Sequence, residues 1–385
     1  MIYLDNSATT WPKPPAVIEA MARYLREIGG NPGRSGHSRS IDAARTLYEA
    51  REALAQYFHV RDPLRIVFTL NATDALNLAL KGLLHPGDHV ITSSMEHNSV
   101  MRPLRDLERK GIELSVVPCS EAGLLDPDDV EKGIRPNTKM VILTHASNVI
   151  GTVLPVRDVG RITRERDLLF LVDAAQTAGA YPMDMDKDCI DLLAFTGHKS
   201  LYGPQGTGGL VIGERVREKE MSPLRQGGTG SRSEFEEQPD FLPDRFESGT
   251  PNGIGIAGLL AGLQFIEERG LETIRRHELG LVGRLLAGLK SISRIKLYGP
   301  KNGRDRMAIL SFNIEGIPSS EVALRLEREF GILCRSGLHC APSAHRTIGT
   351  FPDGTIRFSL GAFSTSAQID AALQAVSKIA SSYDR

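Results

Sequence analysis

The stretch from residue 168 to 209 constrains the fold more than any other part of the chain. It contains two apolar runs, 168–172 and 192–195, whose length and composition are typical of buried strands. Each run ends in a polar cluster, and these clusters contain Asp173 and Lys199. In an open α/β sheet, side chains at the carboxyl ends of strands project into the crevice where ligands bind. We therefore expect an acid and a lysine to meet in one site.

An amine and a carboxylate are the two groups that pyridoxal phosphate (PLP) requires. This cofactor forms a Schiff base with a lysine, and a carboxylate partners its pyridinium nitrogen. Lys199 lies on a glycine-rich turn after Thr196 and His198, whose hydroxyl and N–H groups could hold a phosphate. A surface lysine and an unrelated strand-end aspartate are the plainer alternative, but the nearby Gln176 adds to the pattern. The cluster predicts a PLP site.

The motifs at the two strand ends resemble those of a known family. D-A-A-Q at 173–176, followed by T-G-H-K-S-L-Y-G-P-Q-G at 196–206, is similar to the class V aminotransferase-like PLP enzymes, specifically the cysteine desulfurases. The resemblance extends from D-N-S-A-T-T at 5–10 to Arg357. It implies PLP-dependent fold type I, with a large domain on a mostly parallel doubly wound sheet and a smaller α/β domain.

The alternation of strand and helix from 65 to 213 predicts the doubly wound sheet independently of that resemblance. After it the chain becomes polar and rich in glycine and proline, which marks a change in organisation. We expect a large PLP-binding domain at 13–251, and a small domain formed by 1–12 together with 252–385.

Composition argues against several classes of protein. With 385 residues, 41% of them hydrophobic, the chain is long enough for two globular lobes. A net charge of −1 gives no reason to expect nucleic acid or an anionic membrane as a partner. There is neither a signal peptide nor an apolar run of membrane-spanning length, so a cytoplasmic protein is expected. Four scattered cysteines favour neither a disulfide scaffold nor a metal site.

The junction between a predicted strand at 65–70 and a predicted helix at 73–84 suits a phosphate. A helix N-terminus offers unpaired N–H groups and the positive end of its dipole, and Thr73 adds a hydroxyl. An ordinary threonine cap is the alternative. The resemblance implies that Thr73 and the backbone N–H of Ala72 bind the PLP phosphate.

Further cofactor contacts are implied by the resemblance. His97 would lie flat against the pyridine ring and carry a proton. Asn148 would bond the phenolic oxygen or the substrate carboxylate, and Gln176 the phenolic oxygen. Asp173 would keep the pyridine nitrogen protonated. Thr250, in the segment F-E-S-G-T-P-N, would reach the phosphate of a second subunit, so a homodimer is implied.

Cys340 lies in the segment R-S-G-L-H-C-A, whose glycine and following proline predict a loop that exposes the thiol. Arg335 and His339 lie close to it in sequence and would favour the nucleophilic thiolate. The segment resembles the R-x-G-x-H-C-A loop of group II desulfurases, in which the cysteine accepts sulfur. Leu338 departs from that group, since many of its members have histidine there.

Arg357 has apolar strand residues as neighbours, and its guanidinium suits a carboxylate at two points. A structural salt bridge with Asp353 or a glutamate is the alternative. The resemblance implies that Arg357, helped by Asn148, grips the carboxylate of the substrate. It also implies that Ala8 and Arg335 border the substrate.

The implied activity is removal of sulfur from L-cysteine. Lys199 would take the Cα proton, and the Cys340 thiolate would attack the substrate sulfur, which gives alanine and a persulfide for a sulfur-acceptor protein, as in iron–sulfur cluster assembly. His97 is the expected proton carrier and His339 the alternative. A selenocysteine lyase or a cysteine/cystine lyase is the rival within the family. A non-catalytic sulfur carrier or scaffold is the rival of another class.

Overall fold

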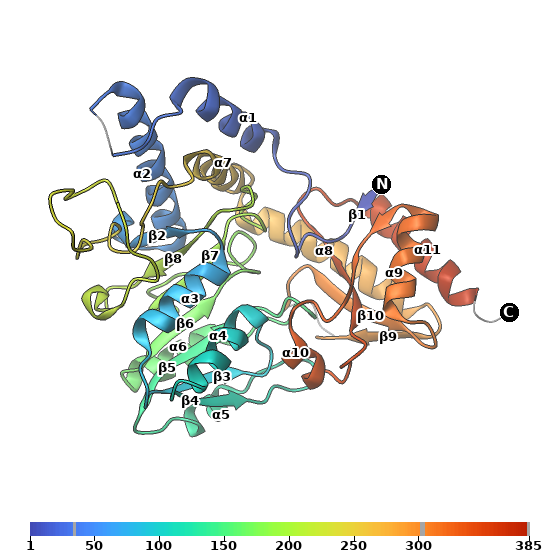
Figure 1. Cartoon of the computed structure of the whole chain (residues 1–385). Helices are drawn as coiled ribbons and strands as arrows, with labels where there is room; N and C mark the ends of the chain where they lie inside the picture. Colours follow the sequence, from blue (N-terminus) through green and yellow to red (C-terminus); the bar gives the residue numbers. More distant parts are fainter. Residues whose placement is uncertain (34–35, 301–304, 383–385) are drawn as a thin grey trace.

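The computed structural model describes residues 1–33, 36–300 and 305–382 and has two lobes, shown in Figure 1. The larger lobe is built on seven strands: β2 (Ile66–Thr69), β3 (His89–Ser93), β4 (Glu113–Val117), β5 (Thr138–Thr144), β6 (Leu169–Asp173), β7 (Leu192–Thr196) and β8 (Gly208–Ile212). Their order across the sheet is β2-β8-β7-β6-β5-β3-β4. Strand β8 runs antiparallel to both neighbours, and the remaining pairs are parallel.

Helices cover both faces of this sheet. The lobe contains α1 (Pro15–Arg23), α2 (Ser38–Phe58), α3 (Ala72–Leu83), α4 (Asn98–Glu108), α5 (Pro127–Lys132), α6 (Val156–Glu165) and α7 (Gly253–Arg269). Helices α2, α6 and α7 pack on one face and α3 and α4 on the other. Successive residues of a strand point to opposite faces of the sheet. Leu143 of β5 therefore packs in the cluster with α2, α6 and α7, and Ile142 packs in the cluster with α3 and α4. The predicted doubly wound, mostly parallel sheet is confirmed.

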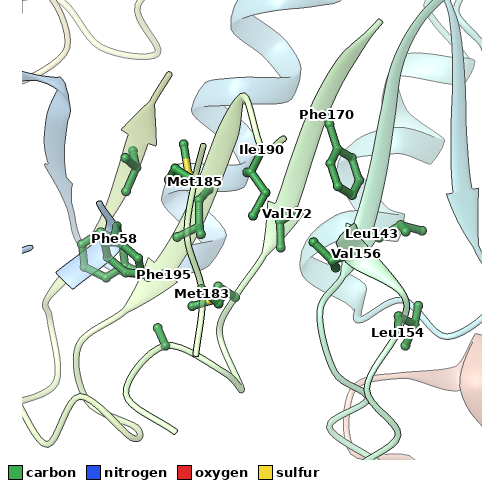
Figure 2. Packing of buried hydrophobic residues seen from close by; sticks show 14 of the residues in the cluster. Phe58, Leu143, Leu154, Val156, Phe170, Val172, Met183, Met185, Ile190 and Phe195 are labelled. Atoms are coloured by element: carbon green, nitrogen blue, oxygen red, sulfur yellow. The ribbon is translucent and has the colours of Figure 1, made fainter. Parts of the chain in front are cut away.

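Figure 2 shows the apolar cluster on the first face, around β6. Phe170 of β6 packs in a cluster with Leu143 of β5 and Phe195 of β7. Phe58, the last residue of α2, lies against Phe195 with 5.4 Å between the ring centroids. These four side chains are fully buried, and burial of each such side chain stabilises the fold by about 1.5–3 kcal/mol. The core therefore fixes the strands at whose carboxyl ends the polar clusters begin.

The smaller lobe has a four-stranded antiparallel sheet with the order β12-β13-β10-β9, formed by β9 (Ile295–Tyr298), β10 (Ile309–Ile314), β12 (Arg335–Gly337) and β13 (Thr355–Ser359). Its helices are α8 (Leu271–Lys290), α9 (Ser319–Phe330), α10 (Pro342–Thr347) and α11 (Ser366–Ser381). The first strand, β1 (Ile2–Tyr3), pairs in parallel with β11 (Ile332–Leu333). Strand β1, near the N-terminus, and α11, the last helix of the chain, therefore both belong to this lobe, as Figure 1 shows.

One segment differs from the sequence predictions. The segment around Cys340 is not one loop, because it contains strand β12 and the short helix α10 with a turn between them. Strand β10 begins at Ile309, and the buried Arg306 just before it donates to the carbonyls of Pro300 and Ile309. Helix α7 packs into the core of the large sheet through residues such as Leu259. The predicted division of the chain at 251/252 stays a prediction, and this packing favours a boundary after α7.

Among the residues that the structure describes, no helix combines the length and apolar character needed to cross a bilayer. Within the same residues, no three or more His, Cys, Asp and Glu side chains gather in the way that a metal ion would require.

Candidate active site

Five strands of the large sheet end at one cavity of about 230 Å³. Its lining residues come from the carboxyl ends of β2, β3, β5, β6 and β7, or from the segments that follow them. Asp173 is the last residue of β6, and Lys199 follows β7 by three residues. Both line the cavity. The structure thus brings together the acid and the amine, at the edge where open α/β sheets bind ligands.

Burial sets the protonation of both groups. It raises the pKa of Asp173, although the backbone N–H of Ala175, 2.9 Å from Oδ1, and the charge of Lys199 oppose that shift. Burial also lowers the pKa of Lys199 to about 8, against the attraction of Asp173 and with help from the positive charge of Arg357. Roughly a tenth of the Lys199 side chains is therefore the free amine at pH 7, far more than for a lysine with its usual pKa, and the free amine is the form that attacks a carbonyl carbon.

The N-terminal segment holds the peptide of Lys199 in place. The ammonium of Lys13 donates to the carbonyl oxygen of His198 at 2.6 Å, and the hydroxyl of Thr9 donates to the same oxygen at 3.1 Å. The hydroxyl of Thr10 donates to the carbonyl oxygen of Lys199 at 2.9 Å. These donors fix the backbone of the turn, so the position of the Lys199 amine depends on its side-chain torsions.

Gln176 and Ala8 meet at this same segment. The side-chain amide of Gln176, which lines the cavity, donates to the carbonyl oxygen of Ser7 at 3.3 Å. The backbone N–H of Ala8 donates to the carbonyl oxygen of Asp5 at 3.0 Å in a tight turn. Ala8 is not among the residues that line the cavity.

Hydrogen-bonding groups gather at the end of the cavity next to helix α3. Ala72 is its first residue, and the side chain of Asn71 caps it by accepting the backbone N–H of Asp74 at 3.0 Å. The hydroxyls of Thr73 and Ser99 lie 2.7 Å apart. Both line the cavity and stand beside the positive end of the α3 dipole. This end suits a phosphate group.

Thr196, the last residue of β7, and His198 also line the cavity. The hydroxyl of Thr196 contacts the carbonyl oxygen of Thr207 at 3.5 Å, which is a weak hydrogen bond. The Nδ1 atom of His198 is buried and has no hydrogen-bond partner among the described residues. A buried polar atom without a partner is costly unless a ligand satisfies it. Together with Asp173 and Lys199, this donor set fits PLP.

His97 caps helix α4 and is held in one tautomer. Its Nδ1 accepts the backbone N–H of Ser99 at 3.1 Å, so the proton of the neutral ring resides on Nε2. Burial, followed by the charges of Lys199 and Arg335, lowers the pKa of His97 to about 3. The imidazole is therefore neutral across the physiological pH range, and Nε2–H is the atom that can donate a proton or a hydrogen bond.

Arg357 of β13 is buried and paired. Its Nη2 donates to Oδ1 of Asp5 at 2.6 Å, and its Nη1 donates to the backbone oxygen of Asn148 at 2.9 Å. The alternative prediction of a salt bridge between Arg357 and Asp353 is wrong, because Asp5 forms the salt bridge with Arg357. The side-chain amide of Asn148 donates to the carbonyl oxygen of His339 at 2.7 Å. Asn148 thus joins the cavity, which it lines, to the turn that carries Cys340.

The exposed thiol of Cys340 lies on a strained turn between β12 and α10. Cys340 has φ of +59° and His339 has φ of +48°, which are left-handed conformations that non-glycine residues adopt at a cost. Nη2 of Arg335 donates to the sulfur at 3.4 Å. Cys340 also lines a hollow of about 430 Å³ that shares Thr73 and His97 with the cavity. The thiol is thus held beside the site.

His339 does not supply the positive charge expected of it. The ring is buried, its Nε2 lies 3.2 Å from the hydroxyl of Thr355, and burial lowers its pKa to about 2. It is therefore neutral near pH 7 and its Nε2 is engaged away from the thiol. Arg335, by contrast, donates a hydrogen bond to the Cys340 sulfur.

Thr250 lies outside the cavity that contains Lys199. It is exposed and lines a different cavity of about 580 Å³, together with residues such as Phe68 and Arg225. Within one chain, the structure does not bring Thr250 to the other site residues. Its predicted contact across a dimer stays a prediction.

Sequence reasoning missed two residues of the site. The hydroxyl of Ser99 forms hydrogen bonds with both Thr73 and His97. Ser99 lies in the first turn of helix α4, beyond the end of strand β3, and a hydroxyl residue at such a position could have indicated it. Asp5 pairs with Arg357, yet 352 positions separate them, and no local pattern links them.

Comparisons with known proteins agree with this geometry. Residues 2–372 match the family model described as aminotransferase class-V. A probable cysteine desulfurase from Methanothermobacter thermautotrophicus is 37% identical over 98% of this chain and 94% of its own. The apo structure of a cysteine desulfurase from Thermococcus onnurineus has a TM-score of 0.93 and 34% identity, covering 99% of this chain and 95% of its own. A cysteine desulfurase structure from Escherichia coli has a TM-score of 0.87 and 29% identity, covering 98% and 94%.

Proposed function

This chain belongs to the class V aminotransferase family and, within it, to the cysteine desulfurases, and from that premise we propose how its own residues remove sulfur from L-cysteine. The family's enzymes depend on PLP. The observation that carries the proposal is the meeting of Lys199 and Asp173 in one cavity, with the thiol of Cys340 lining the adjoining hollow.

The residues proposed to hold the cofactor divide between its two ends. The phosphate would be bound by Thr73, the N–H of Ala72, Thr196, His198 and, from a second subunit, Thr250. The ring would be bound by Asp173 at its nitrogen, by Gln176 and Asn148 at its phenolic oxygen, and by the face of His97. When bound, PLP supplies an electron sink for a carbanion at the substrate Cα.

Lys199 is the proposed base. With a pKa of about 8, its amine is available to accept the Cα proton of L-cysteine at neutral pH. Arg357 would bind the substrate carboxylate and orient the Cα–H bond toward that amine, with Arg335 and Ala8 bordering the substrate. Orientation of this kind accounts for a large part of a typical enzymatic rate enhancement.

Cys340 is the proposed sulfur acceptor. Its thiolate attacks the sulfur of the substrate, so an S–S bond forms as the Cβ–S bond breaks and the electron pair stays with the carbon skeleton. Arg335 donates a hydrogen bond to this sulfur and would hold it in place during the attack. The carbon skeleton takes up protons and leaves as alanine, with His97 Nε2–H as the proposed proton donor. The buried His339, whose Nε2 is engaged by the hydroxyl of Thr355, is the less suitable carrier.

Partners and compartment follow from the same chemistry. We infer that the persulfide passes to a sulfur-acceptor protein, as in iron–sulfur cluster assembly, because an exposed cysteine persulfide can be attacked by a second thiol. A homodimer is inferred from Thr250. A cytoplasmic location is inferred because the exposed Cys340 must stay reduced to act.

Alanine formation from L-cysteine tests the proposal against its rivals. We expect alanine from the wild type and from Cys189→Ala, which removes a cysteine outside the site, and none from Lys199→Ala. Cys340→Ala should lose alanine formation as well. Undiminished turnover in Cys340→Ala would instead indicate a selenocysteine or cysteine/cystine lyase. A wild type that binds no PLP and forms no alanine would indicate a non-catalytic sulfur carrier.

A further inference from the structure

We propose that Asp5 is an internal competitor for the substrate carboxylate at Arg357 and thereby sets how tightly the site binds carboxylates. The inference deepens the proposed function and rests on it, because it requires that Arg357 binds the carboxylate of L-cysteine. Asp5 acts here through Arg357 and is a positioning residue, not a catalytic one.

Arg357 is buried and already paired. Its side chain is only 1% exposed, and a buried charge is costly unless an opposite charge accompanies it. Asp5 supplies that charge by accepting from Nη2 at 2.6 Å. The Nε atom of Arg357 is buried and has no hydrogen-bond partner among the described residues. A substrate carboxylate that binds Nε and Nη2 at two points must therefore take the Nη2 contact from Asp5.

Asp5 has a fixed main chain and a partly exposed side chain. Its backbone bridges to Ser359, which lies two residues after Arg357 on the same strand, and the N–H of Ser7 donates to the hydroxyl of Ser359 at 2.9 Å. The main chain of Asp5 is therefore fixed, while its side chain retains 21% exposure. The Asp5 side chain can therefore move away from Arg357 when the carboxylate of a substrate binds there.

The local charge also supports competition. Arg335 and Arg357 stand directly opposite each other on strands β12 and β13. Like charges at such positions repel, so the pair favours anions between or beside them. Asp5 already offsets part of this positive charge. A substrate carboxylate that displaces Asp5 therefore gains less than it would from an unpaired Arg357.

The sign of the effect separates competition from simple support. If Asp5 competes, its neutralisation leaves Arg357 with an unscreened charge, and carboxylates bind more tightly. If Asp5 only holds the guanidinium in position, its neutralisation lets Arg357 move, and carboxylates bind more weakly. Binding of an unreactive carboxylate therefore distinguishes the two roles.

The test uses the full-length, PLP-loaded protein and propionate, which carries a carboxylate but no amine to react. Its Kd is measured by titration calorimetry. We expect Asp5→Asn to lower this Kd roughly tenfold, which corresponds to about 1.4 kcal/mol, and to lower the KM for L-cysteine in parallel. Asp353→Asn, on the turn before β13, serves as the matched control with an unchanged Kd. In Arg357→Gln, propionate binding is lost, and adding Asp5→Asn does not restore it.

An unchanged or raised Kd in Asp5→Asn would overturn the inference, as would tighter binding that persists in Arg357→Gln. Asp5→Ser, also neutral, provides the same comparison if Asp5→Asn does not fold. Alanine formation by the wild type shows whether only this inference fails or the proposed function fails as well. If the wild type forms alanine and Asp5→Asn binds propionate no better, this inference fails alone. If the wild type neither forms alanine nor binds propionate, the proposed function fails and the inference with it.

Discussion

The guanidinium of Arg335 donates to the sulfur of Cys340 across 3.4 Å. The contact is possible because strand β12 ends at Gly337 and the chain then turns back through the left-handed residues His339 and Cys340. The contact places a charged hydrogen-bond donor on the sulfur that is proposed to act as the nucleophile. Arg335 therefore links the fold of the smaller lobe to the proposed sulfur transfer.

Arg335→Gln should slow persulfide formation on Cys340 by about tenfold, because hydrogen bonds to charged groups contribute roughly 1.5–3 kcal/mol. Arg335→Lys should be intermediate, since it keeps the charge but loses the planar fork. Single-turnover mixing with L-cysteine, followed by mass analysis, measures the rate. Arg328→Gln, on the exposed side of α9, is the control. Equal rates in all four proteins would contradict the role given to Arg335.

Gly179→Ala should lower the free energy of unfolding by about 1–3 kcal/mol and weaken retention of PLP. Gly179 has φ of +89°, and an added Cβ would overlap the carbonyl of Ser200, next to Lys199. The turn that carries the amine must then shift. Gly280→Ala on helix α8 is the matched control, because its Cβ would meet no atom within 4 Å and should be neutral or stabilising. Denaturant unfolding and the visible absorbance of bound PLP are the measurements.

The rate at which apoprotein couples PLP to Lys199 should rise with pH and level off above about pH 9. Burial lowers the pKa of this amine from 10.5 to about 8, so half of it is free at about pH 8, nearly all of it is free above about pH 9, and the free fraction falls about tenfold per unit well below pH 8. Trapping with borohydride and counting the modified Lys199 peptide measures the rate. A rate that keeps rising toward pH 10 would show an unshifted lysine. Lys199→Ala should incorporate nothing at this position.

Thr250→Ala should weaken PLP binding even though Thr250 lies outside the cavity of its own chain. Mixed dimers test whether the contact crosses between subunits. A dimer of one Lys199→Ala subunit and one Thr250→Ala subunit would contain one intact site if Thr250 acts across the interface. We expect such heterodimers, purified through two different tags, to recover close to half of the wild-type activity. Activity no greater than that of the two parent dimers would contradict a shared site.

The sequence predicted the large lobe well because its strands are short apolar runs that end in polar clusters. Asp173 and Lys199 meet because parallel strands present their carboxyl ends at one edge of a sheet. Because all parallel strands of a sheet end at the same edge, locating the two strands in the sequence was enough to predict that Asp173 and Lys199 lie close together.

The rest depended on contacts that no local pattern encodes. The pairing of Asp5 with Arg357 is made by the return of the first strand to the smaller lobe. Strand β12 has three residues, too few for alternation to show, and so the Cys340 segment looked like a loop. The neutral state of His339 results from burial against Thr355. Each of these features appears only when distant segments are packed together.

The mass of the protein after treatment with L-cysteine tests the central claim most directly. We predict a gain of one sulfur on the peptide that contains Cys340, removable by a reductant and absent from both Cys340→Ala and Lys199→Ala. Added sulfur on Cys119, Cys189 or Cys334 instead, or no added sulfur while alanine accumulates, would contradict the proposed transfer to Cys340.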